Sequence, residues 1–323
     1  MLAVDSGGSG LRAVIAVAGV ARTAPVTSAE PVRTGPRGID PGHLLDQLLP
    51  MADRLLRAAG ATELRAVAIG ATGMATLGDA VRAELPAALA KELGVRRLAL
   101  AADAVTAYAG ALGHRPGAVV AAGTGMIALG TDLSAWQRAD GWGHLLGDCG
   151  GGSWIGRAGL EAAMRAFDGR RGGSAALLAR AEEMFGPAGD LPGQLYPRTD
   201  RPAVLASFAP QVAACAPLDA VAAGILRAAA THIAEAVAAV SPASGPCDVA
   251  LTGGLFKMGE PLLAPVRAEL AKQLPHAREI PAEGDPLHGA VRIASDLAAG
   301  GSTGGSTLPH DGRMLYIRTE NDS

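Results

Sequence analysis

The sequence predicts an α/β protein made of two related domains that face each other across a cleft. Two segments carry the same order of features: an apolar run, a turn of small residues and a second apolar run. They are residues 2–17, LAVDSGGSGLRAVIAV, and residues 117–131, GAVVAAGTGMIALGT. Each pattern is typical of a β-hairpin. Two more buried strands are predicted from apolar runs. One lies in residues 64–73 and ends in a turn, and the other lies in residues 97–110 and leads into a helix. The repeated hairpin indicates a duplicated domain.

Composition limits the class of protein. The 323 residues are 49% hydrophobic, which suits one large or two ordinary domains with a sizeable core. The formal charge is −3 and no run of Lys or Arg occurs, so we expect no nucleic-acid partner. No uncharged apolar run is long enough to cross a bilayer, and the N-terminus leads directly into a strand pattern. We therefore expect a cytoplasmic protein without a membrane partner, whose three widely spaced cysteines are reduced thiols.

The first hairpin has the features of a phosphate-binding turn. Asp5 ends its first strand, and Gly7, Gly8, Ser9 and Gly10 form the turn. Backbone N–H groups of such a turn can surround phosphate oxygens, and a nearby carboxylate can hold hydrated Mg²⁺. Glycine turns with an aspartate are also common in ordinary hairpins. The second hairpin repeats the pattern at residues 123–125.

The next segment is predicted to be a loop followed by a helix. Residues 34–42, TGPRGIDPG, are rich in Gly and Pro, and leucines recur at helical spacing over 43–59. Gly60 is positioned to end this helix, and Pro50 is expected to kink or divide it.

Two strand ends carry candidate site residues. Thr72 and Gly73 follow the strand of 64–73, and Asp103 lies where the strand of 97–110 gives way to a helix. Ligands bind at the carboxyl ends of strands in α/β sheets. Thr72 equally suits an ordinary capped turn. Asp103 suits a helix N-cap, a general base that accepts a proton from a substrate hydroxyl, or both.

The stretch 140–156, DGWGHLLGDCGGGSWIG, is the most distinctive part of the chain. It holds seven glycines and two of the three tryptophans. Glycine lets the backbone approach a ligand closely, and tryptophan offers a rigid apolar wall. A helix is predicted from about residue 153 to 167, and its N-terminus would favour an anion. An ordinary glycine-rich surface loop with two anchoring tryptophans is the alternative.

The C-terminal part continues the α/β pattern. A helix is predicted over 219–240, and a buried strand in 247–257 ends in two glycines, 253 and 254. A last helix falls in 284–299. Residues 300–323 are rich in Gly, Ser, Thr and charge, so we expect a flexible tail that contributes little to the fold. The predicted domains are residues 1–110 with the helix 286–299, then residues 111–285.

These motifs, in this order, resemble those of the N-acetylglucosamine kinases in the BadF/BadG/BcrA/BcrD ATPase family. That family belongs to the actin/sugar-kinase/Hsp70 superfamily, so the resemblance implies two ribonuclease H-like, or actin-like ATPase, domains. It implies ATP and Mg²⁺ as cofactors, with Asp5 as the metal-binding residue. It also assigns ATP binding to the residues of both hairpin turns and of the last strand turn: Asp5, Gly7, Gly8, Ser9, Gly123, Thr124, Gly125, Gly253 and Gly254.

The resemblance further implies transfer of the γ-phosphoryl group to the 6-hydroxyl of an amino sugar, with N-acetylglucosamine first. Asp103, followed by Ala104 as in the family, would be the catalytic base. The residues assigned to the sugar are Gly35, Thr72, Gly73, Asp103, Gly125, Trp142, Gly143 and Asp148.

Five positions depart from the family pattern, and alternatives stay open: Ser6, Ser9, Gly10, Gly38 and Cys149. Ser9 keeps a hydroxyl, whereas Gly10 lacks a side chain often present there. Gly38 stands near a sugar-binding Asn of the family, and Cys149 replaces a Glu. Arg37 could substitute for the Asn or be a solvated loop residue. Glucosamine or N-acetylmuramic acid could be the substrate. An ATPase activator of a dehydratase, whose iron–sulfur cluster would need cysteines, and a non-catalytic sugar sensor are the other classes. A homodimer is compatible with the sequence.

Overall fold

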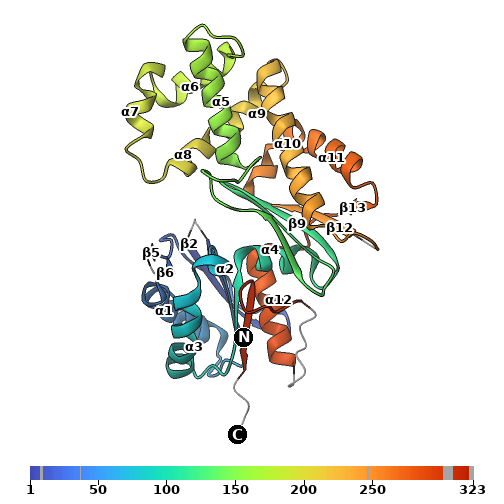
Figure 1. The fold of residues 1–323 in the computed structure, drawn as a ribbon. Helices are drawn as coiled ribbons and strands as arrows, with labels where there is room; N and C mark the ends of the chain where they lie inside the picture. The colour runs from blue at the N-terminus through green and yellow to red at the C-terminus, as the bar shows by residue number, and fades with distance from the viewer. Residues whose placement is uncertain (8–9, 37, 246, 301–307, 320–323) are drawn as a thin grey trace. The chain divides into compact units, whose positions relative to one another are not determined.

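The computed structural model describes all residues except 8–9, 37, 246, 301–307 and 320–323. It divides into two compact units, described separately below (Figure 1). Unit 1 holds the described residues of Met1–Gly117, Thr131–Trp136 and Pro281–Ser323. Unit 2 holds Ala118–Gly130 and the described residues of Gln137–Ile280. Three segments that the sequence assigned to the second domain fall in unit 1 instead: residues 111–117, Thr131–Trp136 and residues 281–285.

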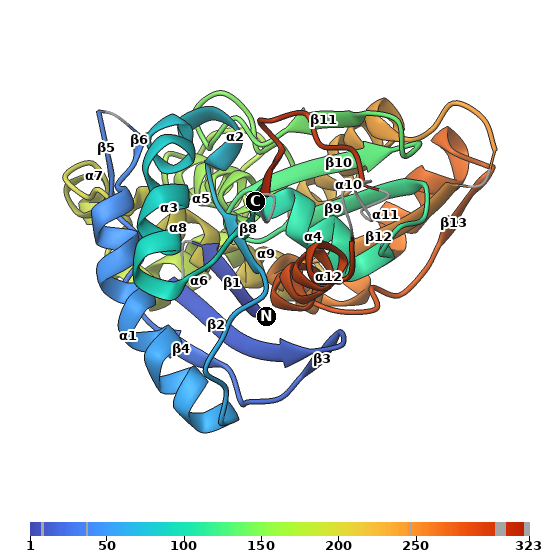
Figure 2. The ribbon, with the colours of Figure 1, turned by 90° about the horizontal axis from the view of Figure 1, so that it is seen from below.

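Unit 1 is built on a seven-stranded sheet with the order β14-β8-β7-β1-β2-β3, in which β4 also pairs with β2. β1 and β2 form the predicted antiparallel hairpin, whereas β1, β7 and β8 run parallel. Helices α1 and α3 cover one face of the sheet, and α4 and α12 cover the other (Figure 2). The elements are β1 (Leu2–Gly7), β2 (Gly10–Val17), β3 (Val20–Ala21), β4 (Val26–Ser28), β5 (Thr34–Gly35), β6 (Gly38–Ile39), α1 (Pro41–Ala59), β7 (Val67–Ala71), α2 (Met74–Leu77), α3 (Asp79–Leu93), β8 (Arg97–Ala102), α4 (Asp103–Leu112), α12 (Pro286–Ala299) and β14 (Leu315–Thr319).

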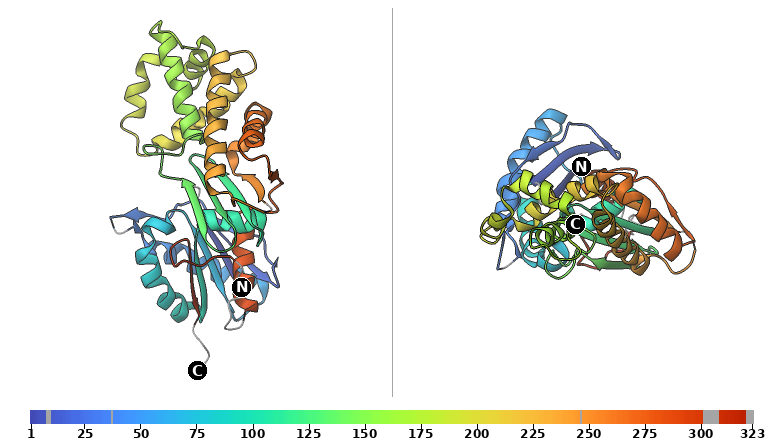
Figure 3. Two further views of the ribbon diagram at one scale, coloured as in Figure 1. Left: turned by 45° about the vertical axis from the view of Figure 1, so that its right-hand side comes forward. Right: turned by 90° about the horizontal axis from the view of Figure 1, so that it is seen from above.

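Unit 2 is built on a five-stranded sheet with the order β11-β10-β9-β12-β13. Its first two strands are the second predicted hairpin. The helices pack on one another around α5 and α10, and Figure 3 shows them grouped together. The elements are β9 (Gly117–Ala122), β10 (Met126–Thr131), β11 (Trp136–Asp140), α5 (Gly152–Phe167), α6 (Ala175–Phe185), the 3-10 turn η1 (Ala188–Asp190), α7 (Leu191–Leu195), α8 (Arg201–Ser207), α9 (Ala209–Cys215), α10 (Ala220–Val240), β12 (Cys247–Thr252), the 3-10 turn η2 (Gly254–Met258), α11 (Glu260–Gln273) and β13 (Ala277–Glu279).

Helix α10 is the one helix of the described chain that is long and apolar enough to cross a membrane by length and composition. The same pattern occurs in the core helices of globular proteins. Leu226, Ile233 and Val237 of this helix are fully buried in the core of unit 2, where they pack with residues of the sheet.

Pro50 was expected to kink or divide its helix, and the division is wrong. α1 is continuous from Pro41 to Ala59, capped by Asp40 at its start and by left-handed Gly60 at its end. Pro50 removes the backbone donor that would bond the carbonyl of Asp46. Both residues are exposed, so water can bond that carbonyl. Leucines on the opposite face are buried and hold the helix together: Leu44, Leu48 and Leu55.

The predicted flexible tail is wrong for residues 308–319. β14 pairs antiparallel with β8, from Leu315 opposite Ala101 to Thr319 opposite Arg97. Leu308, Met314 and Leu315 are buried. This strand was not predicted because it is only five residues long and follows a run of Gly, Ser and Thr. The exposed edge of β8 offers backbone partners that no local pattern reveals.

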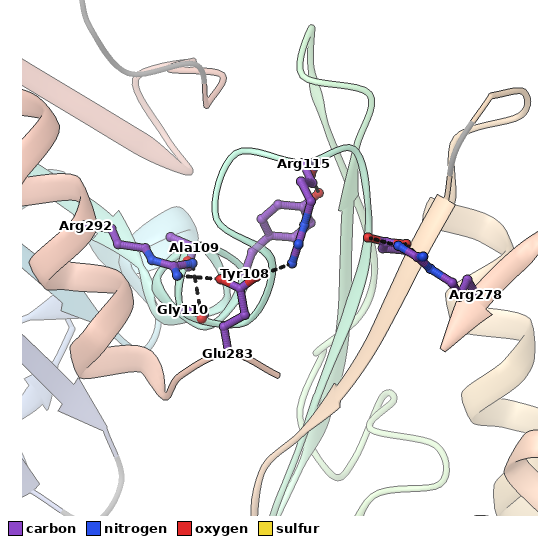
Figure 4. Close-up of polar contacts among 8 residues, drawn as sticks. Tyr108, Ala109, Gly110, Arg115, Arg278, Glu283 and Arg292 are labelled. Carbon is purple, nitrogen blue, oxygen red and sulfur yellow. Dashed lines mark hydrogen bonds and ion pairs between the residues drawn. The ribbon is translucent and has the colours of Figure 1, made fainter. Parts of the chain in front are cut away.

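A polar network joins α4 to the segment before α12 in unit 1 (Figure 4). Glu283 accepts hydrogen bonds from Arg115 Nη2 at 2.6 Å and from Arg292 Nη2 at 2.5 Å. Arg292 Nη1 also donates to the carbonyl of Ala109 at 2.8 Å, near the end of α4. These bonds satisfy a helix end and fix α12 against α4.

Candidate active site

In unit 1, three neighbouring parallel strands bring polar side chains to the same edge of the sheet. Asp5 lies near the carboxyl end of β1, Thr72 follows β7, and Asp103 follows β8. The carboxyl edge of parallel strands is the usual place for a ligand in α/β proteins. The structure thus brings together three residues that the sequence placed in the site.

Asp103 is held by a hydroxyl and a backbone amide. Thr72 Oγ1 donates to Asp103 Oδ2 at 2.8 Å, and the amide of Ala104 donates to Oδ1 at 2.9 Å. The amide of Thr72 in turn donates to the carbonyl of Ser6 at 3.0 Å. Ala102 occupies the N-cap position and Asp103 begins α4, so the N-cap expectation is wrong by one residue. Each carboxylate oxygen retains a further lone pair that can accept a proton or a hydrogen bond.

A salt-bridge network surrounds Asp5. Arg12 donates to Asp5 Oδ2 from Nε at 3.2 Å and from Nη2 at 2.6 Å, and its Nη1 bonds Asp285 Oδ2 at 2.7 Å. Burial raises the pKa of Asp5, and the nearby carboxylates of Asp285 and Asp103 raise it further, whereas Arg12 opposes this shift. Sequence reasoning missed Arg12. The signal was the hairpin register, which places Arg12 directly opposite Asp5.

Asp5 can serve Mg²⁺ as a single carboxylate ligand. Both bonds from Arg12 fall on Oδ2, and no hydrogen bond from a described residue reaches Oδ1. Mg²⁺ usually keeps several waters and takes one or two carboxylates together with substrate phosphates. Among the described residues, no group of three or more His, Cys, Asp or Glu side chains could hold a metal ion. The carboxylate oxygen of Asp5 that accepts no hydrogen bond from a described residue fits that mode of binding, in which substrate phosphates and waters would supply the other ligands.

In unit 2, Asp140 organises the glycine-rich loop of 140–156. Its Oδ1 accepts from the amide of Asp148 at 2.5 Å, and its Oδ2 accepts from the amide of Cys149 at 2.9 Å. Asp140 and Asp148 both have positive φ, 59° and 56°, which is uncommon outside glycine. The side chain of Asp140 thus stabilises a loop conformation that the backbone alone disfavours.

Asp148 points into the turn of the second hairpin. It is 9% exposed, its Oδ1 accepts from the amide of Gly143 at 3.0 Å, and a Cβ on Gly125 would lie 2.2 Å from its Oδ2. Residue 125 must therefore be glycine as long as Asp148 keeps this position. Burial raises the pKa of Asp148, and the charge of Asp140 adds to that effect. Gly125, Gly143 and Asp148 are thus brought together within unit 2.

The N-terminus of α5 does not offer its first amides to an anion, contrary to the expectation. The amide of Gly152 donates to the carbonyl of Gly123 at 2.9 Å, and that of Ser153 donates to the carbonyl of Thr124 at 2.8 Å. These bonds fasten the hairpin turn to the helix. The amides of Gly152 and Ser153 are therefore bonded to carbonyls of the hairpin turn and are not available to a ligand.

Trp142 is exposed and held by an arginine. The residue is 61% exposed, and the guanidinium carbon of Arg138 lies 4.1 Å from the ring centroid. Arg138 also donates to the carbonyls of Asp140 and Gly141, both at 3.0 Å. The cation–π contact and these bonds hold the exposed ring beside Arg138.

The two glycines after β12 differ in their surroundings. Gly253 has φ of 104°, and a Cβ there would lie 2.1 Å from the carbonyl oxygen of Ala122. A Cβ on Gly254 would meet nothing within 4 Å. Gly253 is thus required by the close approach of this turn to the end of β9, where Gly123 begins the second hairpin turn, whereas Gly254 leaves space beside the backbone.

The structure bears on two of the departures from the family pattern, Gly38 and Cys149. Gly38 has φ of 90°, and a Cβ there would lie 2.1 Å from the carbonyl oxygen of Leu77, so no Asn fits this position. Burial, then Asp140 and Asp148, raise the pKa of the Cys149 thiol, which disfavours a reactive thiolate.

The remaining predicted residues are less informative. Gly35 lies in β5 opposite Gly38, and Gly73 is the N-cap residue of α2, with φ of 79°. Gly7 lies beside Thr72. Gly8, Ser9 and Arg37 lie outside the described residues.

Two α/β units, each with a strand–turn–strand hairpin of small residues, define the actin-like class of ATPases and sugar kinases. The chain belongs to the BadF/BadG/BcrA/BcrD ATPase family, which it matches over residues 2–294. The predicted family and the predicted fold of two actin-like domains are confirmed.

Individual proteins resemble the chain to different extents. An N-acetylmuramic acid/N-acetylglucosamine kinase from Clostridium acetobutylicum is 42% identical over 69 residues, which are 21% of this chain and 22% of that protein. The match thus spans about a fifth of that relative. A candidate N-acetylglucosamine kinase from Chromobacterium violaceum has a similar structure, with a TM-score of 0.66, 24% identity, and coverage of 90% of this chain and 96% of that chain. A ROK family glucokinase from Streptomyces griseus, in complex with glucose and AMPPNP, gives a TM-score of 0.55 at 20% identity, covering 93% and 99%. These two structural likenesses concern the fold.

Proposed function

We propose that this protein is an ATP-dependent kinase that phosphorylates the 6-hydroxyl of an amino sugar, with N-acetylglucosamine as the first substrate. The observation that carries the proposal is Asp103 at the carboxyl end of β8, oriented by Thr72. Membership of an ATPase family supports the nucleotide, and the short match to an N-acetylmuramic acid/N-acetylglucosamine kinase supports the sugar class.

Asp103 would accept the proton of the sugar hydroxyl as it attacks the γ-phosphorus. General bases contribute about 10²–10⁴-fold to rate. Thr72 and the amide of Ala104 each bind one carboxylate oxygen, so the carboxylate is held in one orientation, and each oxygen would have a lone pair left for the sugar hydroxyl. Because phosphoryl transfer is largely dissociative, placing the hydroxyl correctly matters as much as removing its proton.

The nucleotide would be bound by backbone amides and small residues. The turn after β1, with Gly7, Gly8 and Ser9, and the turn at residues 123–125 are the proposed phosphate sites. Asp5 is the proposed Mg²⁺ ligand through Oδ1, and the metal would neutralise phosphate charge. The open space beside Gly254 suits a nucleoside, whereas Gly253 shapes the turn.

The sugar-binding roles of Gly35, Gly73, Gly125, Trp142, Gly143 and Asp148 are proposed from the resemblance. Trp142 offers an exposed apolar face of the kind that sugar rings pack against, and Asp148 offers a carboxylate acceptor fixed by backbone bonds. Gly38 cannot supply the amide of the family's Asn. A missing hydrogen bond is worth about 0.5–1.5 kcal/mol, which weakens or redirects sugar specificity without abolishing the chemistry.

The test is a coupled ADP-release assay over free hexoses and amino sugars, with the phosphorylated position assigned by NMR. The proposal expects the highest kcat/KM with N-acetylglucosamine, and glucosamine and N-acetylmuramic acid are the next candidates. ADP release from none of the sugars, by protein that still binds ATP, would overturn it. Anaerobic reconstitution of an iron–sulfur cluster would then favour the dehydratase activator, and sugar binding without turnover would favour the sensor.

A further inference from the structure

A C-terminal segment of unit 1 lies outside the part of the chain that matches the family. The match ends at residue 294, and residues 308–319, here called the C-terminal strap, follow after it. The strap has a defined fold in this protein, and the proposed function leaves it without a role.

The strap is attached to the strand that leads to Asp103. β14 extends the sheet at the edge of β8, with Leu315 opposite Ala101. One more hydrogen bond continues the ladder, from the amide of Ala102 to the carbonyl of Met314 at 2.8 Å. Ala102 is the N-cap residue of α4 and directly precedes Asp103. The last bond of this pairing thus fixes the residue before the proposed base.

The strap also has its own turn, which sets the position of the Met314 carbonyl. Asp311 Oδ1 accepts from the amides of Arg313 at 2.9 Å, Met314 at 2.7 Å and Leu315 at 3.3 Å. Met314 and Leu315 are buried. A carboxylate that satisfies three successive amides defines the entry into β14.

A second contact braces the helix on the other side of Asp103. Trp136 Nε1 donates to the carbonyl of Pro309 at 2.6 Å. The ring of Trp136 lies edge-on to Tyr108 of α4, with 5.3 Å between centroids. Tyr108 is fully buried, and its hydroxyl donates to the carbonyl of Arg115 (Figure 4). The strap therefore contacts β8 directly and α4 through Trp136, and Asp103 joins these two elements.

We propose that the C-terminal strap is a positioning element for Asp103, which it holds through the bond between Ala102 and Met314. The inference rests on the proposed function, because it assigns the strap a part in placing that base. A displacement of about 1 Å from the productive geometry can cost about a hundredfold in rate. Since no hydrogen bond within the described chain joins Asp311 or Trp136 to Asp103, and neither is among the residues proposed to bind sugar or nucleotide, they would act as positioning residues.

The test compares Asp311→Ala with Asp311→Asn, because the Asn side chain keeps an oxygen that can accept the same amides. Hydrogen exchange at the Ala102 amide reports the anchoring bond directly, and kcat and KM are measured separately for sugar and ATP. Asp311→Ala should speed exchange at Ala102 about tenfold and lower kcat about tenfold or more, with KM for ATP nearly unchanged. Asp311→Asn should stay close to wild type in both measurements.

Trp136→Phe is the second variant, in case Asp311→Ala does not fold. It keeps an aromatic ring beside Tyr108 but loses the donor to Pro309 and part of the indole, and it should shift exchange and kcat in the same direction. Three results would each overturn the inference. The amide of Ala102 could exchange at the wild-type rate in these variants, or it could exchange faster while kcat stays at the wild-type value. The third is that Asp311→Ala and Asp311→Asn have equal effects. Absence of sugar-dependent turnover in wild type would refute the proposed function, and with it the catalytic role of the strap. The exchange rates would still show whether the strap holds Ala102.

Discussion

Replacing Gly253 with alanine should destabilise unit 2 strongly. The residue has φ of 104°, and the new Cβ would lie 2.1 Å from the carbonyl oxygen of Ala122. With ψ of 169°, this φ lies in a backbone region that is almost confined to glycine and costs an ordinary residue about 1–3 kcal/mol. Relieving an overpacked contact costs about 1–3 kcal/mol. The free energy of unfolding should therefore fall by about 2–6 kcal/mol, a large part of the total of about 5–15 kcal/mol that domains have. Urea denaturation followed by circular dichroism measures this loss.

Gly254→Ala is the matched control, one residue further along the same turn. A Cβ there meets nothing within 4 Å, so its unfolding free energy should stay within about 0.5 kcal/mol of wild type. Its affinity for ATP should nevertheless fall if the nucleoside lies against this backbone. Equal stabilities of the two variants would refute the reasoning that a close approach to Ala122 requires glycine at 253.

Two further predictions concern hydrogen bonds in unit 1. Thr72→Val should lower kcat about tenfold to a hundredfold, because it removes the donor to Asp103. Thr72→Ser keeps the hydroxyl and should retain most activity. Equal kcat values for the Val and Ser variants would remove this bond from the mechanism. The hydrogen bond with Asp296 raises the pKa of His114 above its ordinary 6.5, against the opposing charge of Arg292. The contribution of protonated His114 to the free energy of unfolding should be complete below about pH 6.5 and disappear as the pH rises through the raised pKa of His114. The difference in unfolding free energy between wild type and His114→Gln should therefore become smaller as the pH rises. A difference that does not change with pH in urea titrations would contradict it.

Much of the fold could be predicted because its signals are local. The two hairpins follow from apolar runs around turns of small residues, and α10 follows from its helical spacing between Asp219 and Ser241. Asp103 could be placed at a strand end because the change from strand to helix pattern falls at that residue. Family membership was predictable for the same reason, since its motifs are short and lie in a fixed order.

The parts that escaped prediction depend on residues far apart in the chain. Arg12 and Asp285 are 273 positions apart and meet only when α12 packs on β1. β14 needed the open edge of β8, which a five-residue pattern cannot reveal. Gly38 was interpreted from the sequence as the loss of a side chain that contacts the sugar. The structure gives a local reason for glycine there, because a Cβ would meet the carbonyl oxygen of Leu77. The proposed roles of the sugar-binding residues stay predictions, because they depend on a bound ligand.

The most direct test of the kinase mechanism is the turnover of Asp103→Asn with N-acetylglucosamine and ATP. Asn keeps the size of the side chain and an oxygen that can accept from Thr72, but it gives up the bond from the Ala104 amide and cannot accept the hydroxyl proton. The variant should fold with an unchanged melting temperature, bind ATP as wild type does, and lose at least about 10²-fold in kcat. Turnover close to wild type would remove Asp103 from the mechanism and contradict the account.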